Sequence, residues 1–138
     1  MAWLPYALLS AAFAGATAIL GKLGVMGLPS NLATAVRTVV ILIFAWAIAL
    51  GRGEHRALLH TEPRSLLFLV LSGITTGLSW LAYFRALQLG PASRVAPIDK
   101  LSLPLTVFLA WLILGEAVSI RSALGVGLMV AGALLTLR

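Results

Sequence analysis

Residues 79–105 read SWLAYFRALQLGPASRVAPIDKLSLPL, and this stretch decides the fold. Within it, a short Gly90-Pro91 turn joins two strongly apolar segments. After the turn come polar and helix-breaking residues at positions where lipid would be expected: Pro97, Asp99, Lys100 and Pro104. Charges and interrupted helices are costly in hydrocarbon, so the stretch predicts a functional site inside a membrane protein.

The composition of the whole chain supports this interpretation. The chain has 138 residues, of which 61% are hydrophobic and 10% are charged, and its mean hydropathy is +1.06. A soluble domain of this size covers itself with more polar residues. We therefore expect an all-α integral membrane protein with a single transmembrane domain over residues 1–138.

Several other classes of function are excluded by the residues that the sequence contains. There is no cysteine, and the two histidines, His55 and His60, share one loop, where surface positions are more common than metal ligands. We expect no metal and no cofactor. No nucleophile–base pair or phosphate-binding glycine loop is present, so an enzyme is not expected. The net charge of +6 comes mostly from segment ends, where lipid head groups explain it better than nucleic acid does.

Turn residues divide the chain into five segments, each long enough to cross hydrocarbon at about 20 residues per helix. These segments cover residues 3–24, 30–50, 63–89, 91–114 and 119–137. Ser30 or Asn31 is expected to cap the second helix, and Ser119 the fifth. Five crossings also place Trp3, Trp46 and Trp111 near one membrane surface, which we call side A. Tryptophans gathered at one surface are typical of an interfacial aromatic belt.

Polar residues recur at helical spacing in four of the segments. Such stripes predict a shared polar cavity, although single Ser and Thr hydroxyls often bond back to their own helix instead. The stripes include Ser10 and Thr17 in the first segment, Thr34 and Arg37 in the second, Ser72, Thr76, Ser79 and Tyr83 in the third, and Asp99, Ser102 and Thr106 in the fourth. The fifth segment instead carries a ridge of small residues, Ala123, Gly127 and Ala131.

The charges inside the segments have functional and structural interpretations. Asp99 and Lys100 are adjacent, so their side chains should diverge by about 100°. Asp99 is expected to face the cavity or to pair with Arg37, Arg85 or Arg94, whereas Lys100 either contributes to the site or reaches toward the interface. Pro97 and Pro104 should free backbone carbonyls, as in the broken helices that border transporter cavities, or else kink the helix for packing. Glu116 is expected to cap the fifth helix or to bond Arg121.

The basic residues near segment ends do not decide the orientation. Near the segment ends, side A has the basic residues Arg52, Arg56, Arg64 and Arg121. The opposite membrane surface, called side B, has Lys22, Arg85, Arg94 and Arg138. The exposed basic loop over residues 52–64 favours an orientation in which side A faces the cytoplasm. The N-terminus lies on side A, so it would be cytoplasmic too. The equal count also agrees with a dual-topology protein that inserts both ways.

A family resemblance follows from residues 83–105, YFRALQLGPASRVAPIDKLSLPL, with LGE at 114–116 and GVGLMVAGALL at 125–135. This pattern resembles the EamA-type unit of the drug/metabolite transporter superfamily, over essentially the whole chain. Familiar members carry two such five-helix units as an inverted repeat of ten helices, and this chain is similar to one unit. The resemblance implies a dimer, which the equal charge count allows to be antiparallel. It also implies that Ala123, Gly127 and Ala131 pack at the dimer interface.

These observations together predict an exporter of small polar or amphiphilic metabolites that works by alternating access as a homodimer. Its place would be the inner (cytoplasmic) membrane of a bacterium or archaeon, with the lipid bilayer and a small-molecule substrate as partners. The predicted substrate pathway comprises Ser10, Thr17, Arg37, Thr76, Ser79, Trp80, Tyr83, Asp99 and Lys100. The alternatives are a non-transporting subunit, half of a heterodimeric transporter, or a flippase for lipid-linked head groups.

Overall fold

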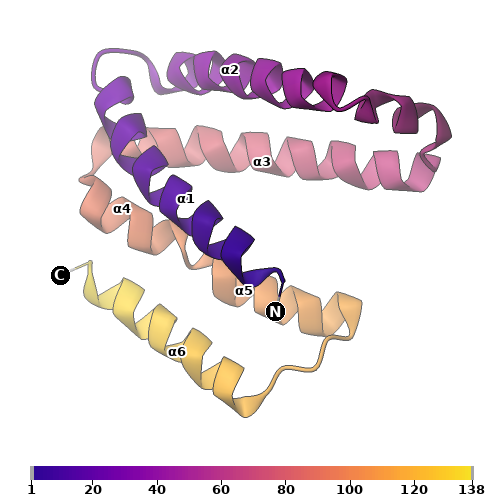
Figure 1. Ribbon diagram of the computed structural model, residues 1–138. Coiled ribbons are helices and arrows are strands. Elements are labelled where there is room, and N and C mark those ends of the chain that lie inside the picture. The colour runs from indigo at the N-terminus through magenta and orange to yellow at the C-terminus, as the bar shows by residue number, and fades with distance from the viewer. Residues whose placement is uncertain (1, 138) are drawn as a thin grey trace. The chain divides into compact units, whose positions relative to one another are not determined.

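The computed structural model describes residues 2–137 and contains helices, turns and irregular segments, with no strand in that range. The predicted all-helical class is therefore confirmed. Arg138, counted above on side B, lies outside the described residues. The chain forms two compact units, one made of Met1–Ile19 with Leu89–Arg138 and the other of Leu20–Gln88 (Figure 1).

The Leu20–Gln88 unit contains the end of α1 (Leu4–Val25), all of α2 (Ser30–Gly51), the 3₁₀ helix η1 (Glu54–His60) and nearly all of α3 (Pro63–Leu89). The α2 helix begins at Ser30, where the expected second segment begins, but its N-cap differs from the prediction. Pro29, not Ser30 or Asn31, is its N-cap, because the extended Pro29 backbone presents its carbonyl to the amide of Ala33 at 3.0 Å. Pro63 occupies the first position of α3, where its missing N–H costs no helical bond.

The other unit contains α4 (Ala92–Asp99), α5 (Ser102–Leu109), a π-helical turn η2 (Ala110–Leu114) and α6 (Ile120–Leu135). Ser119 caps α6 as predicted, because its Oγ accepts a hydrogen bond of 3.1 Å from the amide of Ser122. Gly115, which ends η2, has a φ of 68°, a left-handed conformation that glycine adopts at little cost.

The predicted fourth segment, 91–114, is interrupted at residues 100 and 101, between Pro97 and Pro104. A proline at position 104 cannot donate to the carbonyl of Lys100. That carbonyl instead accepts a tighter bond of 3.0 Å from the amide of Leu103. The amide of Leu101 likewise bonds the carbonyl three residues before it, at Ile98. The interruption is therefore a short 3₁₀-like passage.

Within residues 2–137, four helical stretches are long and apolar enough to cross a membrane: Leu4–Val25, Ser30–Gly51, Pro63–Leu89 and Ala92–Leu114. The remaining helix, α6, has 16 residues. At 1.5 Å per residue it spans about 24 Å, which is shorter than a hydrocarbon core of about 30 Å. The four long apolar helices show that the chain is an integral membrane protein. A fifth crossing by α6 stays a prediction.

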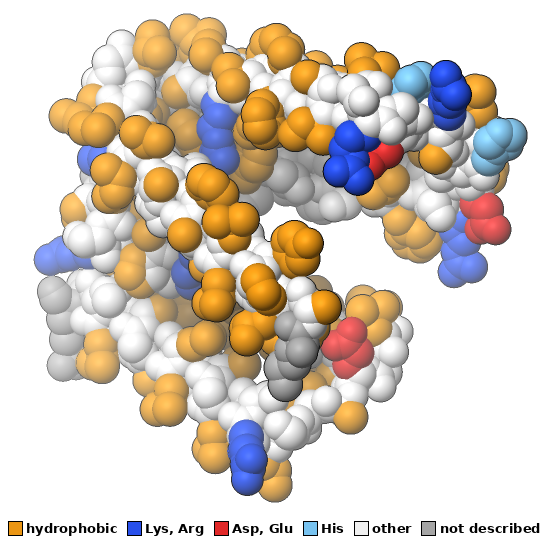
Figure 2. Space-filling view, viewed as in Figure 1, with side chains coloured by type: hydrophobic (Ala, Val, Ile, Leu, Met, Phe, Trp, Pro, Cys, Tyr) orange, Lys and Arg blue, Asp and Glu red, His pale blue; other side chains and the backbone are white. Residues whose placement is uncertain are grey.

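Apolar side chains lie mainly on the outside of the described helices. Leu128 of α6 is 74% exposed and Leu20 of α1 is 69% exposed, whereas only Val25 and Leu87 are fully buried among the large side chains described. Figure 2 shows hydrophobic side chains spread over the visible surface rather than gathered inside. Water would not tolerate so much contiguous apolar surface, so the surroundings of these helices are lipid.

Candidate functional site

A charged side chain lies against two aromatic rings in the Leu20–Gln88 unit. The guanidinium carbon of Arg37, on α2, is 4.2 Å from the centre of the Trp80 ring and 5.3 Å from that of Phe84, both on α3. Trp80 and Phe84 are four residues apart, so they stack along one face of their helix. A cation over aromatic faces is attracted by their negative π surface. We call these three residues the Arg37 cluster.

The aromatic side of the cluster is fixed by packing. Phe84 is 3% exposed and Leu87 is fully buried. Gly21 of α1 lies beside both: a Cβ atom at that position would be 3.4 Å from the Phe84 ring and 3.5 Å from the Leu87 side chain. Tyr83 meets Phe84 edge to face, with ring centres 6.3 Å apart. The ring beneath Arg37 is therefore held by the close approach of α1.

Hydrogen bonds join the end of α3 to the preceding helices. The ammonium of Lys22 donates to the carbonyl of Leu87. Gln88 Nε2 donates to the carbonyl of Leu28 at 3.1 Å, and Gln88 Oε1 accepts from Arg85 at 2.7 Å. The bonds to Leu87 and Leu28 satisfy backbone carbonyls near the segment end that carries the Arg37 cluster.

Three threonine hydroxyls of the predicted polar stripes bond within their own helices. Thr76 donates to the carbonyl of Ser72 at 2.8 Å, Thr34 to Ser30 at 3.0 Å, and Thr106 to Ser102 at 2.9 Å. This is the alternative that the sequence left open for single hydroxyls. A hydroxyl bonded in this way can still accept a hydrogen bond from a substrate, but its proton is engaged.

The predicted pathway residues divide between the two units. Arg37, Thr76, Ser79, Trp80 and Tyr83 belong to the Leu20–Gln88 unit, and Ser10, Thr17, Asp99 and Lys100 belong to the other. Arg37 meets Trp80 directly. Phe84 was not among the predicted pathway residues, because the search followed polar side chains. Its position four residues after Trp80 was the signal that could have found it.

Asp99 and Lys100, which need not pair when adjacent in a helix, form an ion pair in the structure. Lys100 Nζ lies 3.3 Å from Asp99 Oδ2. Helix α4 ends at Asp99, and Lys100 follows as its C-cap. The long lysine side chain bends back to the carboxylate at this helix end. The two side chains are 55% and 34% exposed, for Lys100 and Asp99 respectively.

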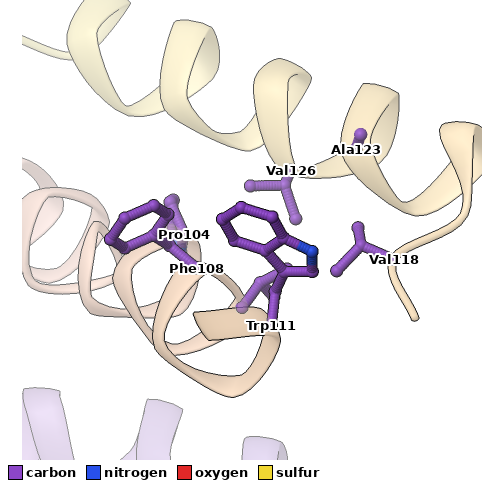
Figure 3. A pocket seen from close by; sticks show the side chains of 7 residues that line it. Pro104, Phe108, Trp111, Val118, Ala123 and Val126 are labelled. Carbon is purple, nitrogen blue, oxygen red and sulfur yellow. The ribbon is translucent and has the colours of Figure 1, made fainter. Parts of the chain in front are cut away.

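An apolar groove lies between α5–η2 and α6, with a volume of about 400 Å³. We call it the α5–α6 groove; its lining is Pro104, Val107, Phe108, Trp111, Val118, Ala123 and Val126. In Figure 3 the Trp111 indole points toward Val126 of α6, with Phe108 and Val118 on either side. The Phe108 and Trp111 rings are 6.1 Å apart. Ala123, Gly127 and Ala131, which were predicted at a dimer interface, are all exposed, and Ala123 also lines this groove.

The remaining charged residues form few ion pairs. Within residues 2–137, ion pairs join Arg52 to Glu54 and Lys100 to Asp99. Glu116 was expected to cap α6 or to bond Arg121. Ser119 provides the cap instead, and no ion pair between Glu116 and Arg121 is present in the described residues. The described chain also contains no group of three acidic, His or Cys residues able to hold a metal ion.

Comparisons with known proteins agree on one family. The model of the EamA-like transporter family matches residues 1–138. A protein of Sinorhizobium sp, named "Uncharacterized transporter in cobO 3'region", is 50% identical over 133 residues, which are 96% of this chain and 94% of that protein. No solved structure matches the chain.

Proposed function

Because the chain belongs to the EamA-like transporter family and is therefore a membrane transporter, we propose that it exports small polar or amphiphilic metabolites. In this proposal the protein works by alternating access as a homodimer in the inner membrane of a bacterium or archaeon. The proposed path is lined by Ser10, Thr17, Arg37, Thr76, Ser79, Trp80, Tyr83, Asp99 and Lys100. Pro97 and Pro104 flank the interruption that would let this path pass through a helix.

The observation that supports this function best is the Arg37 cluster. Arg37 is the eighth residue of α2, so it lies about 10 Å inside a helix that is otherwise apolar. An arginine at such a depth is costly and is typically functional. Trp80 and Phe84 engage its π face, while the N–H groups at the edge of a guanidinium remain the donors that recognise carboxylate or phosphate. An anionic or zwitterionic substrate fits this arrangement.

We expect the purified protein in liposomes to exchange such substrates. Vesicles loaded with unlabelled amino acids and carboxylates would be diluted into the same compounds carrying ¹⁴C, and counterflow would be measured against empty vesicles. Protein-dependent accumulation of at least one labelled anion or zwitterion supports the proposal. Vesicles that hold folded protein and exchange none of these compounds would favour the non-transporting subunit instead.

The homodimer is proposed because one five-helix unit encloses only part of a pathway, and an inverted pair would restore the arrangement of a tandem protein. Dual insertion is the simplest way for one chain to form such a pair. The equal charge count on the two sides, with four basic residues each near segment ends, is consistent with it.

Single cysteines test this orientation cleanly, because the native chain has none. We expect Leu59→Cys in η1 and Leu137→Cys near the C-terminus each to react with an impermeant thiol reagent from both sides of the membrane. Leu59 is 85% exposed and uncharged, so its replacement alters neither packing nor the charge balance. Gly53 is less suitable, because its φ of 71° would strain a cysteine. Labelling of each site from one side alone would contradict the inverted homodimer.

A further inference from the structure

Arg37 is a positive charge without a counter-charge in a membrane-crossing helix. Its guanidinium contacts the rings of Trp80 and Phe84, and within residues 2–137 it takes part in no hydrogen bond and no ion pair. A guanidinium has five N–H donors along its edge, whereas aromatic rings engage its face. The edge of Arg37 therefore awaits an acceptor that the described chain does not supply.

The acidic residues leave no unpaired carboxylate inside the membrane-crossing stretches. The chain has four such residues, and Asp99, the one within a crossing stretch, is held in an ion pair at 3.3 Å. Glu54 lies in η1 and is also paired, at 2.6 Å. Glu62 precedes the first residue of α3, and Glu116 follows the π-helical turn η2. A substrate's ammonium would thus find no free carboxylate along these helices.

Backbone carbonyls at the interruption near Pro97 do not replace the missing carboxylate. In other transporters, interrupted helices offer such carbonyls to cations. Here each of the carbonyls at the interruption already accepts a backbone amide, at 3.0–3.3 Å: those of Ala96, Pro97, Ile98 and Lys100. An ammonium would be only a second donor to them. The charge that the helices leave unbalanced is therefore positive.

We infer that the transported compounds are organic carboxylates without an ammonium group, bound at the edge of the Arg37 guanidinium. This inference rests on the proposed function and narrows its substrate class. A carboxylate places two oxygens against that edge and balances its charge. An amino acid brings the same carboxylate together with an ammonium that must leave water without a partner of opposite charge, which is costly. An organic cation would meet Arg37 with a like charge.

Matched ligands that differ only in their charged groups test the inference. Each set contains a 2-hydroxy acid, the amino acid with the same side chain and the corresponding amino alcohol, for the side chains of alanine, leucine and phenylalanine. Binding to the full chain in detergent micelles would be measured by isothermal titration calorimetry against empty micelles. In the set that binds most tightly, we expect the hydroxy acid to bind at least about tenfold more tightly than the amino acid, and the amino alcohol not to bind.

Three variants locate the binding at the Arg37 cluster. Arg37→Gln should weaken binding of the hydroxy acid at least about tenfold, because it removes the charge and the paired donors. Arg56→Gln removes an exposed positive charge in η1 and should leave the affinity unchanged. The hydroxy acid should also change the fluorescence of Trp80, which subtraction of the Trp80→Phe signal separates from the other three tryptophans.

Failure of this inference is distinguishable from failure of the proposed function. Faster counterflow of an amino acid or amine than of the matched hydroxy acid would keep the transporter and overturn the inference. Calorimetry would also overturn it if no hydroxy acid bound, or if Arg37→Gln bound the hydroxy acid as tightly as the native chain. Counterflow of none of the compounds would reject the proposed function, and the inference with it.

Discussion

Replacing Arg37 with glutamine is expected to lower protein-dependent counterflow at least about tenfold. A hydrogen bond to a charged group contributes about 1.5–3 kcal/mol, and about 1.4 kcal/mol corresponds to a factor of ten in binding. Glutamine keeps a polar side chain of similar length but removes the charge that an anionic group would meet. Initial counterflow rates at several substrate concentrations, normalised to the amount of monodisperse protein, measure the loss.

Matched variants separate this role from a general effect of charge. Arg37→Lys keeps the charge but replaces the planar guanidinium, so we expect a rate between those of the native protein and Arg37→Gln. Arg56→Gln removes one exposed positive charge in η1 and should leave counterflow unchanged. If Arg37→Gln transports as well as Arg56→Gln does, Arg37 is a structural residue and the proposed substrate contact is wrong.

Replacing Phe84 with alanine is expected to lower the free energy of unfolding by about 3–5 kcal/mol, as for other buried aromatic residues. The ring is 3% exposed, lies beside Gly21 of α1 and carries the Arg37 guanidinium of α2 over its face, so its removal leaves a cavity between α1, α2 and α3. Equilibrium unfolding by denaturant in mixed micelles, followed by circular dichroism, measures the change.

A second phenylalanine provides the control for this prediction. Phe44 of α2 is 67% exposed, so Phe44→Ala removes the same ring without opening a cavity and should change the unfolding free energy by less than about 0.5 kcal/mol. Phe84→Leu retains most of the volume and should lie between the two. Equal destabilisation by Phe84→Ala and Phe44→Ala would contradict the packing described for the end of α1.

The local features of this fold could be predicted because each depends on a short stretch of sequence. An apolar run with Pro63 at its start and Gly90-Pro91 after its end predicts a helix over 63–89, and α3 spans Pro63–Leu89. Ser119 was recognised as a cap by its position just before an apolar run. The absence of strands followed from the long apolar segments, which in lipid must satisfy their own backbone hydrogen bonds.

The site itself was less predictable, because its contacts join residues that are distant in sequence. No spacing rule brings Arg37 to Trp80 and Phe84, which lie 43 and 47 positions later on another helix. The Asp99–Lys100 pair was missed for a different reason. A divergence of about 100° holds inside a continuing helix, and α4 ends at Asp99. The α5–α6 groove depends on the π-helical turn at Ala110–Leu114, which apolar periodicity does not reveal.

The bond from Lys22 to the carbonyl of Leu87 has a consequence for the order of events during synthesis. The two residues are 65 positions apart, and the acceptor lies at the end of α3. When α1 leaves the ribosome, this acceptor has not yet been made. The contact between the end of α1 and the end of α3 can form only after α3 has been translated and inserted. The first helix of the chain is therefore among the last to complete its contacts.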